Sequence, residues 1–506
     1  MAAFGFACLA AAAVWMGGLN QDEGWYLYAA NLVAEGRMPY RDFFYTQGPM
    51  LPIVYSAFTW VWKTWGILGA RVFTLLVGSF GILLAAALAR RLAPDGRKGE
   101  AALVTAFLLG SNIYHLYYVT IPKTYALASL FVLAGFLFLS RAVAGGRRAV
   151  TVFLWALSAG VSLAFASGAR ISLGLILCVV GVFLLARVVR RGGSAAGSEF
   201  RGWCFAGFVA GGLGALALVY GPFIVSDGAR EGLFAAQTYH AARGGFDLTW
   251  TVGSLSRLVR WYLPAFVVLG LGVAGLFCGS RRAAVPAMAW VAAWSFAAVF
   301  LLQMLAPFPY EDYNVPIMGL MAVFAAVLFA VAADAAPAEQ GARPRMWALL
   351  LVLGMTWASS FGSPLLEKWS TNGQDRFWSL KKDKYELAQL RDVAKRINAL
   401  DPGGKELFTQ DVYLAIETNR RVPKGFEMGP FAVLSDADIE RAIEETKCPV
   451  AALSGYCFAI DMPVGTERPI GDQMRYWEHL KKKYALADRE EAFGQNSTPL
   501  LILKRK

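Results

Sequence analysis

The chain has 506 residues, of which 57% are hydrophobic and only 17% are charged, and its mean hydropathy is +0.46. Soluble domains carry roughly a quarter charged residues, so this composition excludes a soluble enzyme and indicates a polytopic membrane protein. The formal net charge of +12 is spread over short loops and is not gathered in one patch, which argues against a nucleic-acid partner.

Long apolar runs predict about eleven membrane spans, each of a length suited to cross a bilayer. The first run, Met1–Leu19, has no basic residues before it and is longer than a signal-peptide core, so we expect it to be retained. The expected later spans are Gly66–Ala89, Ala101–Ile113, Lys123–Leu139, Ala149–Ala166, Ile171–Val189, Trp203–Val225, one that ends at Arg281, Val285–Leu305, Val315–Ala333 and Met346–Gly362.

Every second connection between these runs is basic, and the intervening connections are not. The basic residues are Arg90, Arg91, Arg97, Lys98, Arg141, Arg147, Arg148, Arg187, Arg190, Arg191, Arg201, Arg281, Arg282, Arg343 and Arg345. Because cytoplasmic loops are enriched in lysine and arginine, these loops are expected inside, with the N-terminus. The first external loop, 20–65, and the C-terminus are then expected outside.

The composition changes at about Pro364, where a charge-rich segment begins. Helix patterns such as Tyr385–Leu400 alternate there with short strand candidates, which predicts a small extracytoplasmic α/β domain over 364–506, after a transmembrane region over 1–363. Its expected roles are acceptor contact, support of a lid or a structural cap. Cys448 and Cys457 fall in this domain, and they either pair in an oxidising compartment or stay free.

The most informative stretch follows the first span. Gln21-Asp22-Glu23-Gly24 places two neighbouring carboxylates where a membrane helix surfaces, and acids there usually serve chemistry or ion binding, although a hydrated loop is the alternative. Pro39-Tyr40-Arg41-Asp42-Phe43 and Gln47-Gly48-Pro49 come next in the same loop.

In their order and position, these motifs resemble the first external loop of GT-C membrane glycosyltransferases. The similarity is to the protein-mannosyltransferase-like branch, which includes the bacterial lipid A aminoarabinose transferases. It is strong over Asp22–Pro52 and is supported by the order of spans up to Gly362. One departure is Thr46-Gln47-Gly48-Pro49, where the aminoarabinose branch has Glu-Lys-Pro, and this leaves the donor sugar open.

The resemblance implies a GT-C-like fold, a polyprenyl-phosphate sugar donor, inversion at the anomeric carbon and a catalytic carboxylate at Asp22. From the residues alone, Asp22 is the candidate base for the acceptor proton, since burial at a lipid boundary favours proton uptake. Glu23 is expected to orient the acceptor or to pair with a cation; the alternative is that it points to water.

Three cations near the outer ends of spans are candidates to hold the donor phosphate: Arg71, Lys123 and Arg170. Snorkelling to lipid headgroups is the competing explanation. Further candidates for substrate binding are Tyr26, Gln47, His240, Glu311 and Asp312. The spacing of the histidine and these acids is not specific for a metal, so no cofactor is expected, with a divalent metal as the alternative.

We therefore expect a multi-pass glycosyltransferase of a bacterial inner membrane, which moves a sugar from a polyprenyl phosphate to an acceptor at the outer face. The acceptor is left open between a saccharide, a lipid and a protein. The alternative is a transporter or flippase of a lipid-linked saccharide, which would show internal repeats and charged or broken spans near the midplane.

Overall fold

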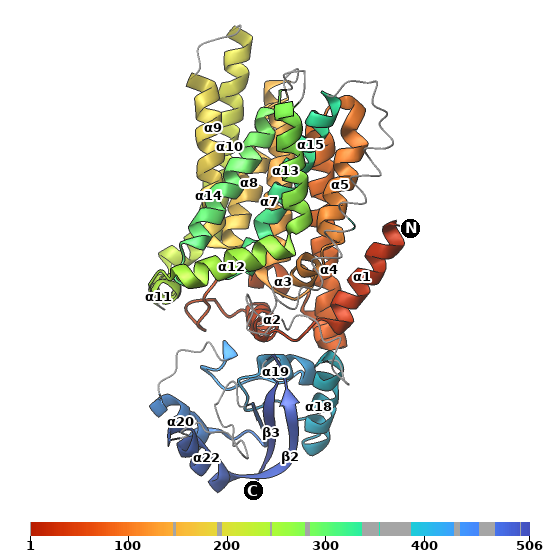
Figure 1. Ribbon diagram of the computed structural model, residues 1–506. Helices are drawn as coiled ribbons and strands as arrows, with labels where there is room; N and C mark the ends of the chain where they lie inside the picture. Colours follow the sequence, from red (N-terminus) through yellow and green to blue (C-terminus); the bar gives the residue numbers. More distant parts are fainter. Residues whose placement is uncertain are drawn as a thin grey trace.

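The computed structural model describes residues 2–144, 148–189, 195–242, 245–278, 284–335, 386–429, 436–454, 471–495 and 497–506, together with Gly354. Within these residues a long helical bundle lies on a smaller domain that contains the C-terminus (Figure 1). The expected last span, Met346–Gly362, and Cys457 lie outside the described residues, apart from Gly354.

The regular elements of the described bundle and of its connections are all helices. The elements are α1 (Ala2–Met16), α2 (Gln21–Ala34), α3 (Met50–Ser56), α4 (Thr59–Leu92), η1 (Asp95–Arg97), α5 (Lys98–Gly110), α6 (Ile113–Tyr118), α7 (Thr124–Ala142), α8 (Ala149–Ala169), η2 (Ile171–Leu173), α9 (Gly174–Val189), α10 (Ala195–Val225), α11 (Ala229–Ala242), α12 (Leu248–Trp261), α13 (Leu263–Cys278), α14 (Ala287–Met304), η3 (Glu311–Asn314) and α15 (Val315–Asp334).

Seven helices of the described chain are long and apolar enough to cross a membrane, and the pair α12 and α13, bent by 80°, would make an eighth. The polytopic membrane fold is thus confirmed, whereas the count of about eleven spans is not. Two of the differences have simple causes: α1 ends at Met16, before the Gly17-Gly18 pair, and α5 has only 13 residues. The segment Glu311–Asp334, with 89% of its apolar window buried, forms the centre of the bundle.

The two ends of the bundle differ in charge. The end of α4 with η1, and the end of α9, carry basic residues and lie away from the C-terminal domain (Figure 1). The opposite end carries the short helices α2 and α3, and also α11 and α12 (Figure 1). Trp60 and Trp65 are 57% and 53% exposed there, as expected of aromatic residues at a headgroup boundary.

The C-terminal domain contains α18 (Glu386–Leu400), α19 (Val412–Thr418), α20 (Asp436–Glu445), β1 (Val450–Ser454), α22 (Gly471–Lys483), β2 (Tyr484–Phe493) and β3 (Thr498–Arg505). The strands form an antiparallel sheet in the order β1-β3-β2, with Ala452 opposite Ile502. The mixed helix and strand content agrees with the sequence-based expectation. Strand β2 was not predicted, because its middle is charged and only its ends are buried.

One hydrophobic cluster joins the first external loop to this domain. Leu27 and Trp62 of the loop side belong to the same buried cluster as Leu390, Tyr413 and Leu453 of the domain, separate from the core of the bundle. Gly24 allows the close approach, because a Cβ there would lie 2.2 Å from the backbone nitrogen of Tyr413. The external loop therefore folds as part of the C-terminal domain's core (Figure 1).

Candidate functional site

The site begins at the first turn of α2, whose start is fixed by a reciprocal cap. The Asn20 side chain accepts a hydrogen bond from the Asp22 N–H at 3.0 Å, and Glu23 Oε1 accepts one from the Asn20 N–H at 3.0 Å. This capping box satisfies two of the donors that a helix N-terminus leaves free. It therefore fixes where the two neighbouring carboxylates point.

Glu23 points into the protein and pairs with Arg71. The Arg71 Nε and Nη2 atoms donate to the two carboxylate oxygens at 2.7 and 2.6 Å, and neither side chain is exposed. The remaining N–H groups of Arg71 donate to the carbonyls of Val14, Gly17 and Gly18 at 2.8–3.0 Å. All five donors of the guanidinium are thus used within the protein.

This geometry places Glu23 and Arg71 outside the cavity that holds the other candidates. Arg71 has no donor left for a phosphate, and Glu23 neither faces an acceptor nor points to water. Of the alternatives expected for Glu23, the structure shows the pairing with a cation. The pair locks the end of α1, the start of α2 and the middle of α4 together.

Asp22 faces the other way, into a cavity of about 300 Å³ that we call the reaction cavity. Its lining residues are Asn20, Asp22, Trp25, Tyr26, Thr46, Gln47, Tyr118, Lys123, Tyr125, Arg170, Tyr239, Tyr310, Glu311, Asp312, Tyr313 and Gln495. Nearly all the remaining candidates from the sequence, contributed by five separate parts of the chain, therefore meet at one place. The exception is His240, whose side chain lies outside the described residues.

Within the reaction cavity, Lys123 joins two carboxylates. Its Nζ lies 2.8 Å from Asp22 Oδ2 and 3.0 Å from Asp312 Oδ2, and Asp312 also accepts from the Tyr125 hydroxyl at 2.7 Å. The other Asp22 oxygen accepts from the Trp25 indole N–H at 3.0 Å. An ionised carboxylate offers about four acceptor positions, so Asp22 is oriented but keeps room for an acceptor proton.

Arg170 is the cation of this cavity without a carboxylate partner among the described residues. Its guanidinium lies 4.9 Å from the ring centre of Tyr125 and 4.8 Å from that of Tyr313, and the whole residue is only 8% exposed. One long hydrogen bond of 3.4 Å reaches Thr124, while the buried Nε has no partner in the described structure. A buried, aromatic-flanked cation with an unmet donor is suited to an anionic ligand.

A second cavity of about 380 Å³, the side cavity, adjoins the first through Arg170, Thr46, Gln47 and Tyr313, which line both. Its other lining residues are Gly48, Ile171, Ser172, Gln237, Leu302, Gln303, Leu305, Ala306, Pro307 and Phe308. Ile171, Leu302 and Leu305 are 52%, 47% and 65% exposed on the outside of the bundle. A mainly apolar channel thus leads from Arg170 towards the lipid-facing surface.

The acids after α14 have separate partners. Glu311 Oε2 accepts from the Ser254 hydroxyl and pairs with Arg257 Nε, both at 3.0 Å, so it is held by α12 at the rim. Asp312 points inward to Lys123. The two acids therefore belong to one cavity wall, but only Asp312 joins the cluster around Asp22.

The Pro-Tyr-x-Asp-Phe motif builds the loop beneath the cavities. Asp42 Oδ2 accepts from the Met38 N–H at 2.7 Å, and the Tyr40 hydroxyl donates to the Gln47 carbonyl. Tyr40 adopts a φ of 68°, the left-handed region that is uncommon for a non-glycine residue. The motif thus shapes the loop that brings Thr46 and Gln47 into both cavities.

The C-terminal domain reaches the same helix start. Gln495, beside the turn between β2 and β3, lines the reaction cavity and accepts from the Gln21 N–H at 2.9 Å. Glu386 accepts from the Leu19 N–H at 2.6 Å, and Asp411 accepts from the Gln21 side chain at 3.0 Å. Three separated positions of the domain therefore hold the segment that carries Asp22.

Sequence reasoning missed Tyr125, Tyr313 and Gln495. The two tyrosines carried a weak signal, since each stands next to or near a proposed charged residue at a span end: Tyr125 two after Lys123, and Tyr313 after Asp312. Gln495 carried none, because it comes from a distant turn whose position only the tertiary fold reveals.

Neither of the two histidines whose side chains the structure describes lines the reaction cavity. His115 is 2% exposed, its Nδ1 lies 3.0 Å from the Tyr262 hydroxyl, and burial lowers its pKa to about 3. His479 lies in the C-terminal domain, 3.4 Å from Glu444. In the described part of the chain, no three histidine, cysteine or acidic residues are grouped to hold a metal ion.

Comparison with solved structures bears on the fold. ArnT from Cupriavidus metallidurans in the apo state superposes with a TM-score of 0.61, over 99% of this chain and 98% of that chain, at 14% identity. The same protein bound to undecaprenyl phosphate gives 0.60, over 98% and 97%, at 13% identity. The chain has the fold of ArnT. The GT-C fold expected from the motifs of the first external loop is therefore confirmed.

A further similar structure is an oligosaccharyltransferase from Archaeoglobus fulgidus in complex with Zn and sulfate. It gives a TM-score of 0.48 at 12% identity, over 95% of this chain and 71% of that chain. No protein-family model matches the sequence, and no curated protein matches it.

Proposed function

We propose that the chain is a membrane glycosyltransferase that moves a sugar from a polyprenyl-phosphate carrier to an acceptor hydroxyl. The observation that carries the proposal is Arg170, a buried cation held between two tyrosine rings with an unmet donor, at the junction of the two cavities. A phosphate there would receive the Nε–H, and its charge would offset that of the guanidinium. The similarly folded ArnT, solved with undecaprenyl phosphate, supports the same ligand chemistry.

The side cavity supports a lipid carrier. Its apolar wall extends from Arg170 to exposed aliphatic side chains, so an isoprenoid tail would leave the phosphate site directly into the bilayer. The sugar would then occupy the reaction cavity, which is smaller and lined by polar groups and tyrosines.

Asp22 is proposed as the base. It would take the proton of the acceptor hydroxyl while that oxygen attacks the anomeric carbon and the bond from this carbon to the phosphate oxygen breaks. The bonding pair leaves with the polyprenyl phosphate, whose growing charge faces Arg170 and Lys123. The resulting inversion, like the base assignment, extends what the resemblance to GT-C enzymes implies.

The charge of the two bundle ends supports the orientation. The described helix ends that carry basic residues lie opposite the C-terminal domain, so by the positive-inside rule we place that domain, the cavities and Asp22 on the outer side. We therefore place the reaction at the outer face of a bacterial inner membrane, with the N-terminus cytoplasmic.

The test compares lipid binding with turnover in three variants of the full chain in lipid nanodiscs. Asp22→Asn should bind undecaprenyl phosphate like the wild type, and its sugar transfer should fall by about 10²–10⁴-fold. Arg170→Gln should weaken binding of the lipid phosphate by about tenfold or more. Arg260→Gln is the matched control, since Arg260 is also a buried arginine stacked on an aromatic ring, Trp261, but lines neither cavity.

Unchanged lipid binding in Arg170→Gln would contradict the phosphate site. Full transfer by Asp22→Asn would contradict the base. Movement of a lipid-linked saccharide across the membrane without transfer, insensitive to Asp22→Asn, would favour the transporter alternative.

A further inference from the structure

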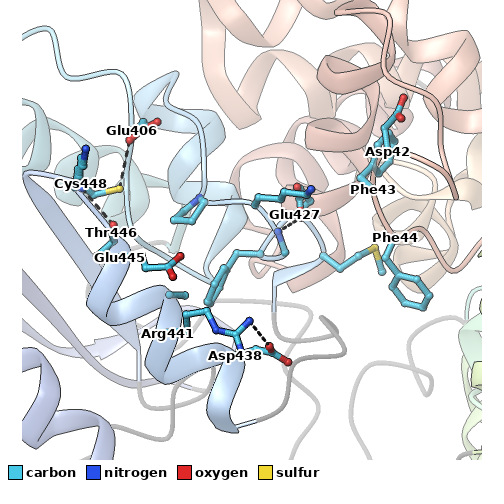
Figure 2. Close-up of a pocket in the computed structure, with 17 residues that line it drawn as sticks. Asp42, Phe43, Phe44, Glu406, Glu427, Asp438, Arg441, Glu445, Thr446 and Cys448 are labelled. Carbon is cyan, nitrogen blue, oxygen red and sulfur yellow. Dashed lines mark hydrogen bonds and ion pairs between the residues drawn. The ribbon is translucent and has the colours of Figure 1, made fainter.

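A cavity of about 760 Å³ lies between the first external loop and the C-terminal domain, and we call it the interdomain cavity. Figure 2 shows Asp42, Phe43 and Phe44 on one side and the residues of the domain on the other. The domain contributes two walls, the loop Pro423–Met428 and helix α20 with the residues that follow it. The cavity is large enough for a ligand of several hundred daltons.

Helix α20 presents an unpacked polar face to this space. Asp438, Arg441, Ala442 and Glu445 all line the cavity, and their spacing of three, four and seven residues places them on one side of the helix. Ile443, on the opposite side, is fully buried in the domain core. One side of α20 therefore packs on the domain core, and its polar side faces the cavity (Figure 2).

The opposing surface is aromatic. Phe43 and Phe426 are 6% and 1% exposed and form the floor, whereas Phe44 is only half-buried. Figure 2 shows Phe44 at the edge of the cavity, apart from the acids of the domain. A sugar ring has C–H groups on its faces and hydroxyls around its rim, so aromatic surface together with carboxylate acceptors matches both parts.

The charges of the lining argue against an anionic ligand. The acids are Asp42, Glu406, Glu427, Asp438 and Glu445, and the bases are Lys424, Arg441 and Lys447. Arg441 pairs with Asp438 at 3.4 Å, and Asp42 and Glu427 have the arginine partners Arg41 and Arg37. The lining therefore has no excess of positive charge to attract a phosphate, and an uncharged ligand suits it better.

Glu427 is the most enclosed of these acids. The residue is 7% exposed, its Oε2 accepts from the Gly425 N–H at 2.7 Å, and its Oε1 forms a long ion pair of 3.9 Å with Arg37. A carboxylate has about four acceptor positions, so Glu427 retains the capacity to accept from a ligand hydroxyl.

The interdomain cavity and the reaction cavity are lined by residues that lie close together in the chain. Phe44 lines the first, whereas Thr46 and Gln47 line the second. The Phe44 ring also packs edge to face on Tyr239 of α11, with centroids 6.0 Å apart, and Tyr239 lines the reaction cavity. Neighbouring extended residues span about 3.3 Å each, so a ligand of two or three sugar units is long enough to reach from one cavity to the other.

We propose that the interdomain cavity binds the non-reacting part of an uncharged acceptor saccharide, whose end then reaches Asp22. This inference rests on the proposed transferase function and names the acceptor class that the sequence left open. It assigns the C-terminal domain a direct part in acceptor recognition.

The experiment measures binding of soluble trisaccharides to the full chain in nanodiscs by saturation-transfer NMR. The neutral probes are mannotriose, maltotriose and triacetylchitotriose, and the anionic probes are trigalacturonate and a phosphorylated mannotriose. Undecaprenyl phosphate binding is measured on the same samples. At least one neutral probe should bind, and neither anionic probe should.

Two variants and two controls locate the binding. Phe44→Ala should weaken binding of the neutral probe by about tenfold, since it removes an aromatic contact, and Glu445→Lys should weaken it as well. Phe246→Ala and Glu444→Lys should bind like the wild type, because Phe246 is an exposed aromatic residue that lines none of the three cavities, and Glu444 adjoins Glu445 but does not line the interdomain cavity. Lipid-phosphate binding should be unchanged in all four variants.

Binding of no neutral probe, binding of an anionic probe instead, or equal loss in the control variants would each overturn the inference. The proposed function would survive such a result as long as undecaprenyl phosphate still binds and depends on Arg170. Conversely, saccharide binding that depends on Phe44 without any lipid-phosphate binding would leave this site in place and contradict the donor site.

Discussion

Two ion pairs involve neighbouring acids, Glu23 and Asp22, and they differ in their surroundings. Glu23 and Arg71 form a fully buried pair with every guanidinium donor used, whereas Asp22 and Lys123 form a pair at a cavity, with side chains 20% and 8% exposed. One helical step of about 100° separates the two acids, and the capping box of α2 fixes both directions. We therefore propose a structural role for the first pair and a functional role for the second, and experiments can distinguish the two roles.

The largest expected effect comes from breaking the buried pair. Arg71→Met should destabilise the protein by about 3–5 kcal/mol, because it leaves the buried Glu23 charge without its partner and removes the Arg71 hydrogen bonds to the carbonyls of Val14 and Gly17. A large fall in melting temperature of the detergent-solubilised chain would measure this. Arg230→Met is the control, since Arg230 is half-exposed and lies 3.7 Å from Asp227, a surface pair worth about 0–1 kcal/mol. Equal melting temperatures for the two variants would contradict the structural role of Arg71.

Breaking the cavity pair should affect turnover more than folding. Lys123→Met removes the group that orients Asp22 and Asp312, and transfer should fall by about 10²–10³-fold while the melting temperature shifts far less than in Arg71→Met. The readouts are kcat with the lipid-linked donor and the melting curve. Lys63→Met, at an exposed lysine of α4, is the control and should change neither. A Lys123→Met protein as unstable as Arg71→Met would remove the distinction between the pairs.

A smaller effect is expected from removing a contact between the C-terminal domain and the start of α2. Gln21→Ala leaves Asp411 without one donor and should cost about 1–2 kcal/mol, with a reduced kcat and unchanged binding of undecaprenyl phosphate. Gln389→Ala removes a similar amide contact, to Glu490 at 2.8 Å, away from α2. It should lower stability without the effect on kcat. Equal kcat values for the two variants would show that the domain does not position Asp22.

Much of the fold was accessible from the sequence, because apolar length and the distribution of basic residues report directly on the bilayer. The order of motifs in the first external loop identified the fold class that the solved structures confirm. The count of spans was not accessible, since helices such as α5 and α1 fall short of a full span and α12 turns sharply into α13. Hydropathy measures composition, and it does not measure where a helix bends.

For the candidate site, the sequence predicted several of the residues that line one cavity, but not the contacts that each of them makes. Asp22, Lys123 and Arg170 were named from their place at span ends, and all three line one cavity. Arg71 was named by the same reasoning, yet it lies in a closed ion pair, because position along a span does not reveal the side of the helix that faces a partner. The contribution of Gln495 depends on contacts more than 470 positions apart in the chain and had no local signal.

The contacts of Leu19 and Gln21 also bear on how the protein is made. Their hydrogen-bonding partners are at positions 386, 411 and 495, so the first outer loop emerges long before the groups that fix it have been synthesised. During most of translation this loop lacks its hydrogen-bonding partners from the C-terminal domain. Its aromatic residues also lack the hydrophobic core that they later join. A nascent or truncated chain should therefore be inert, and the transferase would become competent only once its last strands have crossed the membrane and closed onto the loop.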